Sequence, residues 1–475
     1  MNNDPATQSA IHWALMHGLA LKTGEGSADH CAFSFAPVQI DREHFAQLKQ
    51  AVALMGKIIH AVSESHEFLR ESLEPLEDSD CLFGHLLKLH RQIHDKKAKA
   101  LRQPLLIMRT DFMDDVQAGP KVIEFNGIAA GMGPFGGKVH QLHHYLQQTT
   151  PDEFNYWAGS DQFELVPNDA TSQLAKGIAE SAITVRKQSG ESGQPVFLMV
   201  VQPDEDNVYD QKLLELALHK LGVKAVRRTF RQLHDELSTG DNNRLHLKAV
   251  GHLDVVYLRA GYQPEDYIAH DLEEARCCES LGQTRAFIEQ HYVAVNATIS
   301  QQLATSKRVQ MLLTSMTEEQ LTVFNLTLEE ARIVKGFLGE MNPVNSQSSK
   351  WFKQQLPSEW VLKNQGEGGG HCIFGDDIAP KLQSLDLHPE HYHSWALMRR
   401  LCPLPRKAPA LLVRKGKGAQ VNDLISEIGL FTVHFNGESV TSENGYAGYL
   451  VRSKPAGVSE GGVHSGMGVL DSLAY

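Results

Sequence analysis

A lysine, a carboxylate and a run of glycines stand together near residue 365. Lys363 ends an apolar stretch that predicts a strand over Trp360–Lys363, and Glu367 and Gly368–Gly370 follow within eight residues. Glycine lets backbone N–H groups approach an anion closely, a lysine adds a positive charge for a phosphate, and a carboxylate can hold a magnesium ion that bridges phosphates. No Lys-Ser or Lys-Thr follows the glycines, so this is not a Walker A loop. The segment predicts a nucleotide-triphosphate cradle, although a flexible glycine turn between two strands accounts for the same residues.

Two pairs of polar residues at i, i+2 spacing lie at the ends of predicted strands. Glu124 and Asn126 close a strand predicted over Lys121–Phe125, and their side chains point to the same side of it. A carboxylate and an amide oxygen on one side are suited to magnesium. Arg109 and Asp111 form a similar pair after the preceding strand. The alternative function of such residues is capping and turn hydrogen bonding by Asp and Asn.

A third candidate is the pair Arg452 and Lys454, which precedes a glycine-rich loop at residues 461–466. Two cations on one side of a strand, beside backbone donors, suit a substrate carboxylate or a phosphoryl group in transfer. A solvated basic strand would have the same sequence.

The composition limits the class of protein. The chain has 475 residues, which at about 150 residues per domain suggests about three units. Its formal net charge of −12 lacks the basic excess typical of nucleic-acid-binding proteins. No apolar run approaches the roughly 20 residues needed to span a bilayer. The Met1–Pro5 start carries no positively charged side chain, which makes it a poor signal-peptide pattern. The six cysteines are scattered without a CxxC pair, so we expect reduced thiols and a cytoplasmic location. From the net charge and the short apolar runs we expect neither nucleic acid nor membrane as a partner.

The elements that must position these residues follow from periodicity. Apolar residues at i, i+3, i+4 spacing predict helices over His44–Ile59 and Leu82–Lys99. Strand and helix patterns alternate over residues 195–295, which predicts a mostly parallel sheet that could form its own lobe. We further expect a glycine-rich turn from Gly127 to Gly137. Ala408–Arg414 and Ile425–Phe435 are predicted as antiparallel strands separated by residues 415–418.

The motifs resemble the eukaryotic-type glutathione synthetase family over nearly the whole chain. The resemblance begins with the segments Lys363 to Gly370, Ile425 to Phe431, and Leu450 to Lys454 with Gly461-Gly462-Val463. Further matching segments, in the family's order and spacing, are Arg109-Thr110-Asp111, Glu124-Phe125-Asn126, Asp206 to Gln211, Arg259-Ala260-Gly261-Tyr262 and Lys307 to Gln310.

The resemblance implies an α/β protein with a permuted ATP-grasp fold, a parallel-sheet substrate-binding lobe and a glycine-rich lid. It implies three parts: an N-terminal part over residues 1–194, the lobe over 195–295, and an ATP-grasp part over 296–475 with a lid at about 335–405. It also implies a homodimer that ligates γ-glutamylcysteine to glycine with ATP and Mg²⁺ through an acyl phosphate.

The resemblance also implies roles for individual residues. Those implied to hold magnesium are Glu124, Asn126 and Glu367. Those implied on the ATP side are Met113, Lys307, Lys363, Glu367, Gly368, Gly369, Gly370, Met398, Glu427 and Lys454. Those implied to bind the peptide substrate are Arg109, Glu205, Asn207, Gln211, Arg259 and Tyr262, with Arg452, Val463 and His464 at the glycine end. The residues implied to act directly on the reacting groups are Arg452, Lys363 and Lys307.

The chain departs from the family pattern where substrate is bound. Ala129 and Gly131 stand where the family usually has serines, Ala260 replaces an aspartate, and His464-Ser465 replace two alanines. These departures leave three hypotheses: a glutathione synthetase, a ligase of the same family with another acceptor amino acid or thiol peptide, and a non-catalytic homologue that binds nucleotide or peptide. The retained Glu124, Asn126 and Glu367 count against the third.

Overall fold

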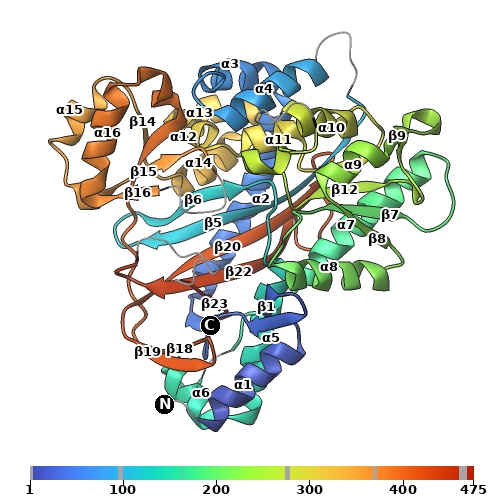
Figure 1. The fold of residues 1–475 in the computed structure, drawn as a ribbon. Coiled ribbons are helices and arrows are strands. Elements are labelled where there is room, and N and C mark those ends of the chain that lie inside the picture. The colour runs from blue at the N-terminus through green and yellow to red at the C-terminus, as the bar shows by residue number, and fades with distance from the viewer. Residues whose placement is uncertain (1–3, 95–99, 163, 273–278, 367–371, 459–467) are drawn as a thin grey trace.

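A single mixed sheet of 13 strands forms the centre of the molecule in the computed structural model. The model describes residues 4–94, 100–162, 164–272, 279–366, 372–458 and 468–475. The sheet order is β19-β18-β3-β23-β22-β20-β5-β13-β12-β7-β8, with β6 paired to β5 and β21 to β20 (Figure 1). The strands are β3 (Phe33–Ser34), β5 (Gln103–Asp115), β6 (Gly119–Asn126), β7 (Val196–Val200), β8 (Lys224–Arg228), β12 (Val255–Leu258), β13 (Ala294–Asn296), β18 (Ala410–Arg414), β19 (Lys417–Val421), β20 (Leu424–Phe435), β21 (Glu438–Ser439), β22 (Tyr446–Pro455) and β23 (Val469–Asp471).

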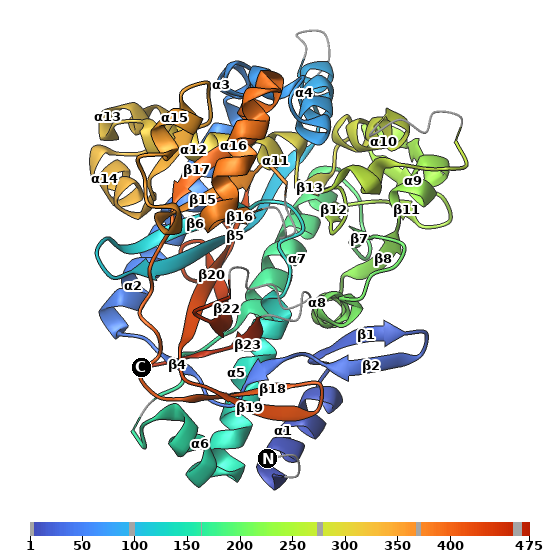
Figure 2. The ribbon, with the colours of Figure 1, turned by 60° about the vertical axis from the view of Figure 1, so that its left-hand side comes forward.

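Alternating apolar side chains anchor this sheet between two cores. In β7, Leu198 and Val200 join one buried cluster, and Phe197 and Met199 join the other. Successive strand residues point to opposite faces, so a continuous apolar run is expected for a strand covered on both sides. Helices therefore lie against both faces of the sheet (Figures 1 and 2).

The two helical layers come from different parts of the chain. On one face, α2 packs directly against β5 and β20, and other helices pack around α2. On the other face, α5 packs against β22, and α7 packs against β20 and β22. The helices are α1 (Pro5–Met16), α2 (Arg42–Glu64), α3 (His66–Leu73), α4 (Cys81–Ile93), α5 (Gly133–Thr149), α6 (Pro151–Ala158), α7 (Ala170–Gln188), α8 (Val208–Lys220), α9 (Phe230–Glu236), α10 (Glu279–Glu289), α11 (Ile299–Ala304), α12 (Lys307–Ser315), α13 (Glu318–Leu321), α14 (Leu328–Phe337), α15 (Ser348–Phe352) and α16 (Ile378–Asp386).

A separate four-stranded antiparallel sheet lies at one end of the molecule. Its order is β14 (Met341–Pro343), β17 (Trp395–Arg399), β15 (Trp360–Asn364) and β16 (Cys372–Phe374). It has its own small apolar core with α16, in which Trp360 and Leu362 are buried. Three smaller pairings complete the fold: β1 (Ala20–Gly24) with β2 (Ser27–His30), β9 (Leu237–Thr239), β10 (Leu245–Leu247) and β11 (Gly251–His252) together, and β4 (Val38–Gln39) with β24 (Leu473–Ala474).

Most predicted elements are confirmed, with three corrections. β7, β8, β12 and β13 are parallel as expected, and β13 continues in parallel onto β5, so the 195–295 segment shares the central sheet. The turn predicted over Gly127–Gly137 is wrong beyond residue 132, because α5 begins at Gly133 with Pro134 in its first turn. Proline fixes a helical φ there, and packing outweighs the low helix propensity of glycine.

The second correction concerns the strand after β18. Both predicted strands form antiparallel pairs, but residues 415–418 are not simply the segment between them, because Lys415 and Gly416, both at positive φ, turn the chain into a further strand, β19, which pairs with β18. Two successive residues at positive φ are the geometry of a tight hairpin. β20 instead lies between β22 and β5.

The third correction concerns cysteine. Cys31, Cys372 and Cys402 are free, whereas Cys81 is disulfide-bonded, so the expectation of reduced thiols is wrong for Cys81. Separation along the sequence does not limit how closely two thiols approach in the fold.

Among the described residues, no helix combines the length and apolar character needed to cross a bilayer.

Candidate active site

A charged cluster replaces the apolar side chains at one end of the central strands. In β5, Leu105 and Ile107 belong to one of the two cores, and Arg109 and Asp111 continue the same face by the two-residue period. The register places Arg109 opposite Asn126 of β6 and Asp111 opposite Glu124. The i, i+2 pairs seen in the sequence therefore meet across one strand pair.

Asp111 is the anion around which this cluster is built. Its side chain is fully buried, and it accepts two hydrogen bonds from Arg109, at 2.6 Å from Nε and 2.8 Å from Nη2. It also accepts from Asn126 Nδ2 at 2.9 Å and from Arg452 Nη2 at 3.0 Å. A buried carboxylate requires such partners to offset its lost hydration.

Glycine makes this packing possible in the neighbouring strand. A Cβ at Gly429 of β20 would lie 2.5 Å from Asp111 Oδ1 and 2.7 Å from Arg109 Cδ. No other residue type fits there without displacing the pair. Glu427, two residues before Gly429 in β20, lies opposite Arg452 of β22 and accepts a hydrogen bond from the Arg452 Nη2.

The second half of the cluster joins Glu124 to two lysines. Lys307, the first residue of α12, donates to Glu124 Oε2 at 3.0 Å, and Lys363 of β15 donates to the Ile123 carbonyl at 2.9 Å. Both lysine side chains are buried, while 28% of the Glu124 side chain is exposed. Solvent therefore reaches the Glu124 side chain while the two lysines are shielded.

The local charges fix the ionisation of these groups. Burial alone would raise the pKa of Glu124, but Lys307, Lys363 and Arg452 outweigh it and hold the pKa well below its usual range. Burial lowers the pKa of Lys363, and Glu124 opposes that change. Burial also raises the pKa of Glu427, against the opposing effect of Arg452. Glu124 is therefore an anion at neutral pH, held among cations.

A second set of predicted residues lies beside the first, around Arg259. Arg259 Nη1 donates to Asp210 Oδ2 at 3.1 Å, and Asp210 also accepts the backbone N–H groups of Met132 at 2.9 Å and Phe135 at 3.3 Å. Three buried polar atoms in this set have no hydrogen-bond partner among the described residues: Asn207 Oδ1, Gln211 Nε2 and Arg259 Nε. Buried polar atoms without partners are costly and are commonly satisfied by a ligand or water.

Gly131 connects the two sets. Arg109 Nη1 donates to the Gly131 carbonyl at 3.1 Å, and a Cβ at Gly131 would lie 2.5 Å from Arg259 Nη2. Gly131, one of the residues that depart from the family pattern, therefore leaves the space that the Arg259 guanidinium occupies. Tyr262 completes the set, and burial together with Asp266 and Glu205 raises its pKa to about 12.

The remaining predicted residues lie around the charged cluster. Met398 is buried with Met311, Met341 and Ala396 in a small apolar cluster. Met311 and Lys307 are at i, i+4 on α12, so this apolar cluster adjoins the charged one. Met113 lies in β5 opposite Lys121, and Lys454 lies in β22 opposite Ile425, two residues beyond Arg452. Glu367, Gly368–Gly370, Val463 and His464 lie outside the described residues.

Asp210 holds Arg259 in place, although no sequence motif assigned it a role. Its signal is its position: Asp210, Leu214 and Leu218 recur at i, i+4, i+8 and are all buried on α8. A charged residue in an apolar helical repeat calls for a buried partner, here Arg259.

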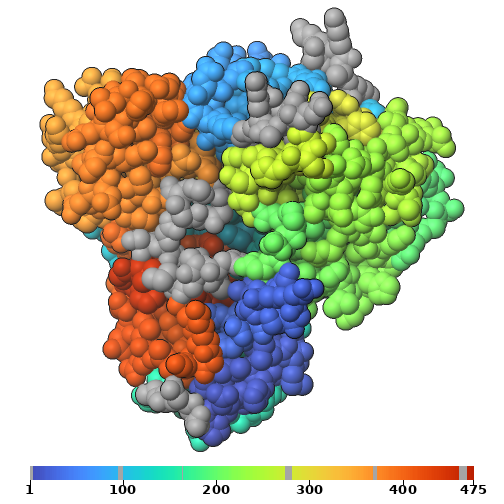
Figure 3. Space-filling view, viewed as in Figure 1, coloured from blue at the N-terminus to red at the C-terminus, as the bar shows by residue number. Residues whose placement is uncertain are grey.

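The space-filling view shows this face of the molecule hollowed between orange, green and dark-blue segments, with red and teal residues at the base (Figure 3). By the colour bar, the orange segment is the region of the four-stranded sheet, the green segment is the β7–β12 region, and the dark-blue segment is the N-terminal region. The red and teal residues belong to parts of the central strands. Charged side chains at the ends of central strands, with unpartnered buried polar atoms beside them, define an α/β protein with a polar ligand-binding site.

Comparison with known proteins gives the family. The family model described as "Eukaryotic glutathione synthase, ATP binding domain" matches residues 2–475. The chain belongs to the eukaryotic glutathione synthase family.

Individual relatives agree over the same length. The chain is 28% identical over 98% of its length to a protein named "Glutathione synthetase, chloroplastic" from Arabidopsis thaliana, of which the match covers 84%. It is 27% identical over 98% of its length to "Glutathione synthetase" from Homo sapiens, of which the match covers 95%. A solved structure of a glutathione synthetase-like effector from Globodera pallida, in apo form, superimposes with a TM-score of 0.72 at 18% identity, covering 99% of this chain and 97% of that one. That likeness shows that the fold is shared.

Proposed function

We propose that the protein is an ATP-dependent ligase that joins γ-glutamylcysteine to glycine through an acyl phosphate. Its family and the names of its relatives support this activity. The single observation in the structure that carries it is the position of two buried lysines, Lys307 bonded to the Glu124 carboxylate and Lys363 to the neighbouring Ile123 carbonyl, beside a set of unpartnered polar atoms. The first set suits phosphates and the second suits a peptide.

We call Glu124, Asn126, Lys307 and Lys363 the phosphate side. A carboxylate cannot form an amide without activation, and phosphorylation by ATP places growing negative charge on phosphoryl oxygens. Lys307 and Lys363 would stabilise that charge, since fixed cations in a partly closed site need little rearrangement. The adjoining apolar cluster around Met398 would take the adenine ring, and Lys454, Glu427 and Met113 would lie along the nucleotide. Gly368–Gly370 would close over the phosphates and exclude water from the acyl phosphate.

The phosphate side fits magnesium in its donor chemistry. Glu124 supplies an ionised carboxylate, and the Asn126 Nδ2 bond to Asp111 commits that nitrogen and leaves Oδ1 to serve as a ligand. Oxygen donors of this kind suit Mg²⁺, with Glu367 as the third protein ligand in the proposal. When bound, the ion would neutralise phosphate charge. Lys307, now paired with Glu124, would turn to a phosphate oxygen.

We call Asn207, Gln211, Arg259 and Gly131 the peptide side. The unpartnered atoms Asn207 Oδ1, Gln211 Nε2 and Arg259 Nε comprise an acceptor and two donors, which matches the mixed polar groups of a dipeptide. Glu205, Tyr262 and Arg109 would complete this binding surface. Arg452 would orient the reacting carboxylate, with Val463 and His464 at the glycine end.

The finer architecture belongs to the same proposal. The central strands would form a permuted ATP-grasp core over residues 1–194 and 296–475, with residues 195–295 as the substrate-binding lobe. The four-stranded sheet at residues 341–399 would be the body of a lid spanning about 335–405. The protein would act as a cytoplasmic homodimer, which size-exclusion chromatography with light scattering and cell fractionation would test.

The test is ADP release and product mass with γ-glutamylcysteine and a panel of acceptors: glycine, serine and β-alanine. The proposal expects γ-glutamylcysteinylglycine and acceptor-dependent ADP release. A different preferred acceptor would favour the second ligase hypothesis, for which His464-Ser465 are the motivating departure from the family pattern. The double variant His464→Ala/Ser465→Ala should then shift preference towards glycine. Nucleotide binding without any acceptor-dependent turnover would favour the non-catalytic homologue.

A further inference from the structure

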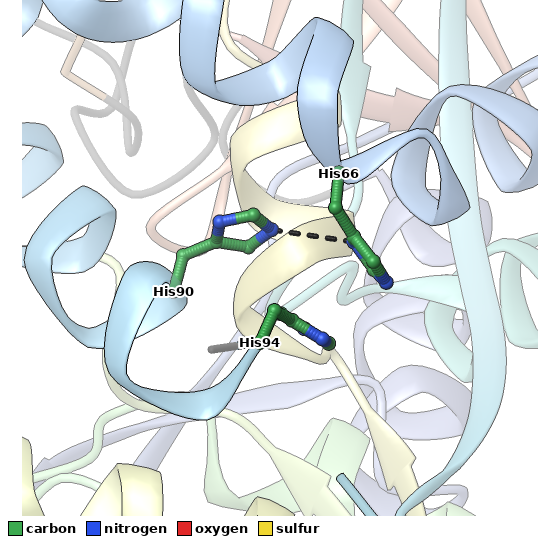
Figure 4. A group of neighbouring side chains, drawn as sticks. All are labelled: His66, His90 and His94. Carbon is green, nitrogen blue, oxygen red and sulfur yellow. Dashed lines mark hydrogen bonds between the residues drawn. The ribbon is translucent and has the colours of Figure 1, made fainter. Parts of the chain in front are cut away.

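Three histidines converge in the helical layer formed by α3 and α4. His66 is the first residue of α3, His90 lies in the last turn of α4, and His94 directly follows α4. One ring nitrogen from each lies within 4.8 Å of the other two (Figure 4). His90 and His94 are four residues apart, which brings both rings to the same side of the helix end. None of the three belongs to the phosphate side or the peptide side.

The rings are packed against one another with their nitrogens poorly satisfied. His66 and His94 stack with ring centroids 3.7 Å apart, and His90 Nε2 lies 3.4 Å from His66 Nδ1. His94 Nε2 lies 3.3 Å from Ser300 Oγ of α11. These contacts are long for hydrogen bonds. The His90 side chain is fully buried, and its Nδ1 has no hydrogen-bond partner in the part of the chain that the structure describes.

The cluster offers neutral imidazoles. Burial, with smaller contributions from nearby arginines, lowers the pKa of His66. Burial, followed by the neighbouring histidines and arginines, lowers the pKa of His90 to about 3 and that of His94 to about 2. Neutral imidazole is the form that binds metal. The charged groups acting on the cluster are Glu64, Arg70, Arg91 and Arg102.

Two of these arginines carry their charge in ion pairs. Arg102 pairs with Glu64 at 3.1 Å and with Glu289 at 3.4 Å, and Arg91 pairs with Glu77 at 2.5 Å. The carboxylates reduce the repulsion that a bound cation would meet at the histidines.

We propose that His66, His90 and His94 form a binding site for a divalent transition-metal ion of the Zn²⁺ class, with water as the fourth ligand. Zn–N distances of about 2.0–2.1 Å in a tetrahedral site require nitrogens about 3.3 Å apart. The ring nitrogens lie within 4.8 Å of one another, so the more widely separated ones have to move closer, and rotation about χ2 is soft enough for that adjustment. An all-nitrogen set prefers Zn²⁺, Co²⁺ or Cu²⁺ to Mg²⁺, which prefers oxygen. The site is thus chemically distinct from the proposed magnesium site, and the ion would join α3 to the end of α4.

The test titrates chelator-treated full-length protein with Co²⁺ and Zn²⁺ in the presence of millimolar Mg²⁺. We expect one Co²⁺ per chain with visible absorption bands of a tetrahedral site, displaced by Zn²⁺ and unaffected by Mg²⁺. Saturating Zn²⁺ should raise the melting temperature by about 3 °C, because only the folded chain has the site. The variant His66→Gln/His94→Gln leaves the buried His90 in place and should lose the absorption, the stoichiometry and the thermal shift.

A second histidine pair provides the matched control. His246 and His252 of β10 and β11 have ring centroids 5.7 Å apart and no third histidine in their group among the described residues. The variant His246→Gln/His252→Gln should bind Co²⁺ as the wild type does. The single variant His94→Gln, whose ring is half-buried, carries the test if the double variant does not fold. Absence of one-to-one uptake by the wild type, or its survival in folded His66/His94 variants, would overturn the proposal.

Discussion

The phosphate side and the peptide side satisfy their polar groups in opposite ways. On the phosphate side, Lys307 meets Glu124 at 3.0 Å and Lys363 meets a backbone carbonyl at 2.9 Å, so the positive charges already have partners. On the peptide side, Asn207, Gln211 and Arg259 each keep a buried polar atom without a partner. Residues on the phosphate side would exchange their internal partners for a ligand. Residues on the peptide side would gain in a ligand the hydrogen-bond partners that they lack.

This difference has an energetic meaning. Ion pairs that must be opened offset part of the binding energy of ATP, but they keep the lysines ionised and in place. Unpartnered atoms lose nothing when a ligand arrives, so each ligand contact counts fully, and any change that moves Arg259 is felt directly. We therefore expect variants on the phosphate side to change turnover and variants on the peptide side to change the KM for peptide.

The largest effect is expected for Glu124→Gln. It removes the anion that faces Lys307 and would bind magnesium, so kcat should fall by about 10³-fold or more. Solvent reaches 28% of the side chain, so folding should be little affected. ADP release measures the first effect and thermal denaturation the second. A kcat within tenfold of wild type would remove Glu124 from the phosphate side.

Arg452→Lys should have the next largest effect and tests the boundary between the two sides. Arg452 Nη2 contacts both Asp111 and Glu427, and a lysine cannot reproduce the planar, forked guanidinium. We expect kcat/KM for peptide and acceptor to fall by about 10²-fold, with the Kd for ATP changed far less. Equal losses for ATP and peptide would assign Arg452 to the phosphate side.

Gly131→Ala should act on the peptide side alone. Its Cβ would lie 2.5 Å from Arg259 Nη2, so the guanidinium has to move while Asp210 still holds its other nitrogen. We expect the KM for γ-glutamylcysteine to rise about tenfold, corresponding to roughly 1.4 kcal/mol, with kcat nearly unchanged.

Gly137→Ala is the matched control for that substitution. It makes the same chemical change in α5, where the nearest atom to a Cβ is at an ordinary 3.5 Å. If the KM of Gly137→Ala equals that of the wild type and the KM of Gly131→Ala is raised, the cause is the contact between the new Cβ at position 131 and Arg259. An unchanged KM in Gly131→Ala would show that the position of Arg259 does not matter to substrate binding.

Strand periodicity indicated the charged cluster around Asp111 more directly than the residues around Arg259, for a physical reason. Glu124 and Asn126, and Arg109 and Asp111, are at i, i+2 on strands, and the two-residue period alone puts each pair on one side. Lys307 was implicated only through the family resemblance, since its approach to Glu124 joins residues 183 positions apart. The space that Gly131 leaves for Arg259 depends on how the β12 end packs beside the β6–α5 connection, which no local pattern encodes.

The same limit explains the errors in the fold. The sequence pattern predicted the strands that became β18 and β20, but the order β22-β20-β5 is a non-local arrangement, and the strand β19 between β18 and β20 was missed. Glycines 133, 136 and 137 suggested a turn, whereas tertiary packing holds them in α5. The histidine cluster was also missed, because His66 comes from another helix, although His90 and His94 at i, i+4 were a visible signal.

The smallest effect should be a shift in pH dependence, which sharpens the idea that the phosphate side is held together by its own charges. Burial lowers the pKa of Lys363 below the ordinary value of about 10.4, and Glu124 opposes that change. Lys363 therefore loses its charge, and ADP its affinity, at a lower pH than an exposed lysine would allow. Glu124→Gln removes the opposing anion, lowers this pKa further, and should move the alkaline loss of ADP binding to lower pH. Glu427 raises the pKa of Lys363 less than Glu124 does, so Glu427→Gln should give a smaller shift in the same direction. Calorimetric titration of ADP across alkaline pH measures all three proteins, and an alkaline midpoint in Glu124→Gln at or above that of the wild type would show that Glu124 does not hold the charge of Lys363.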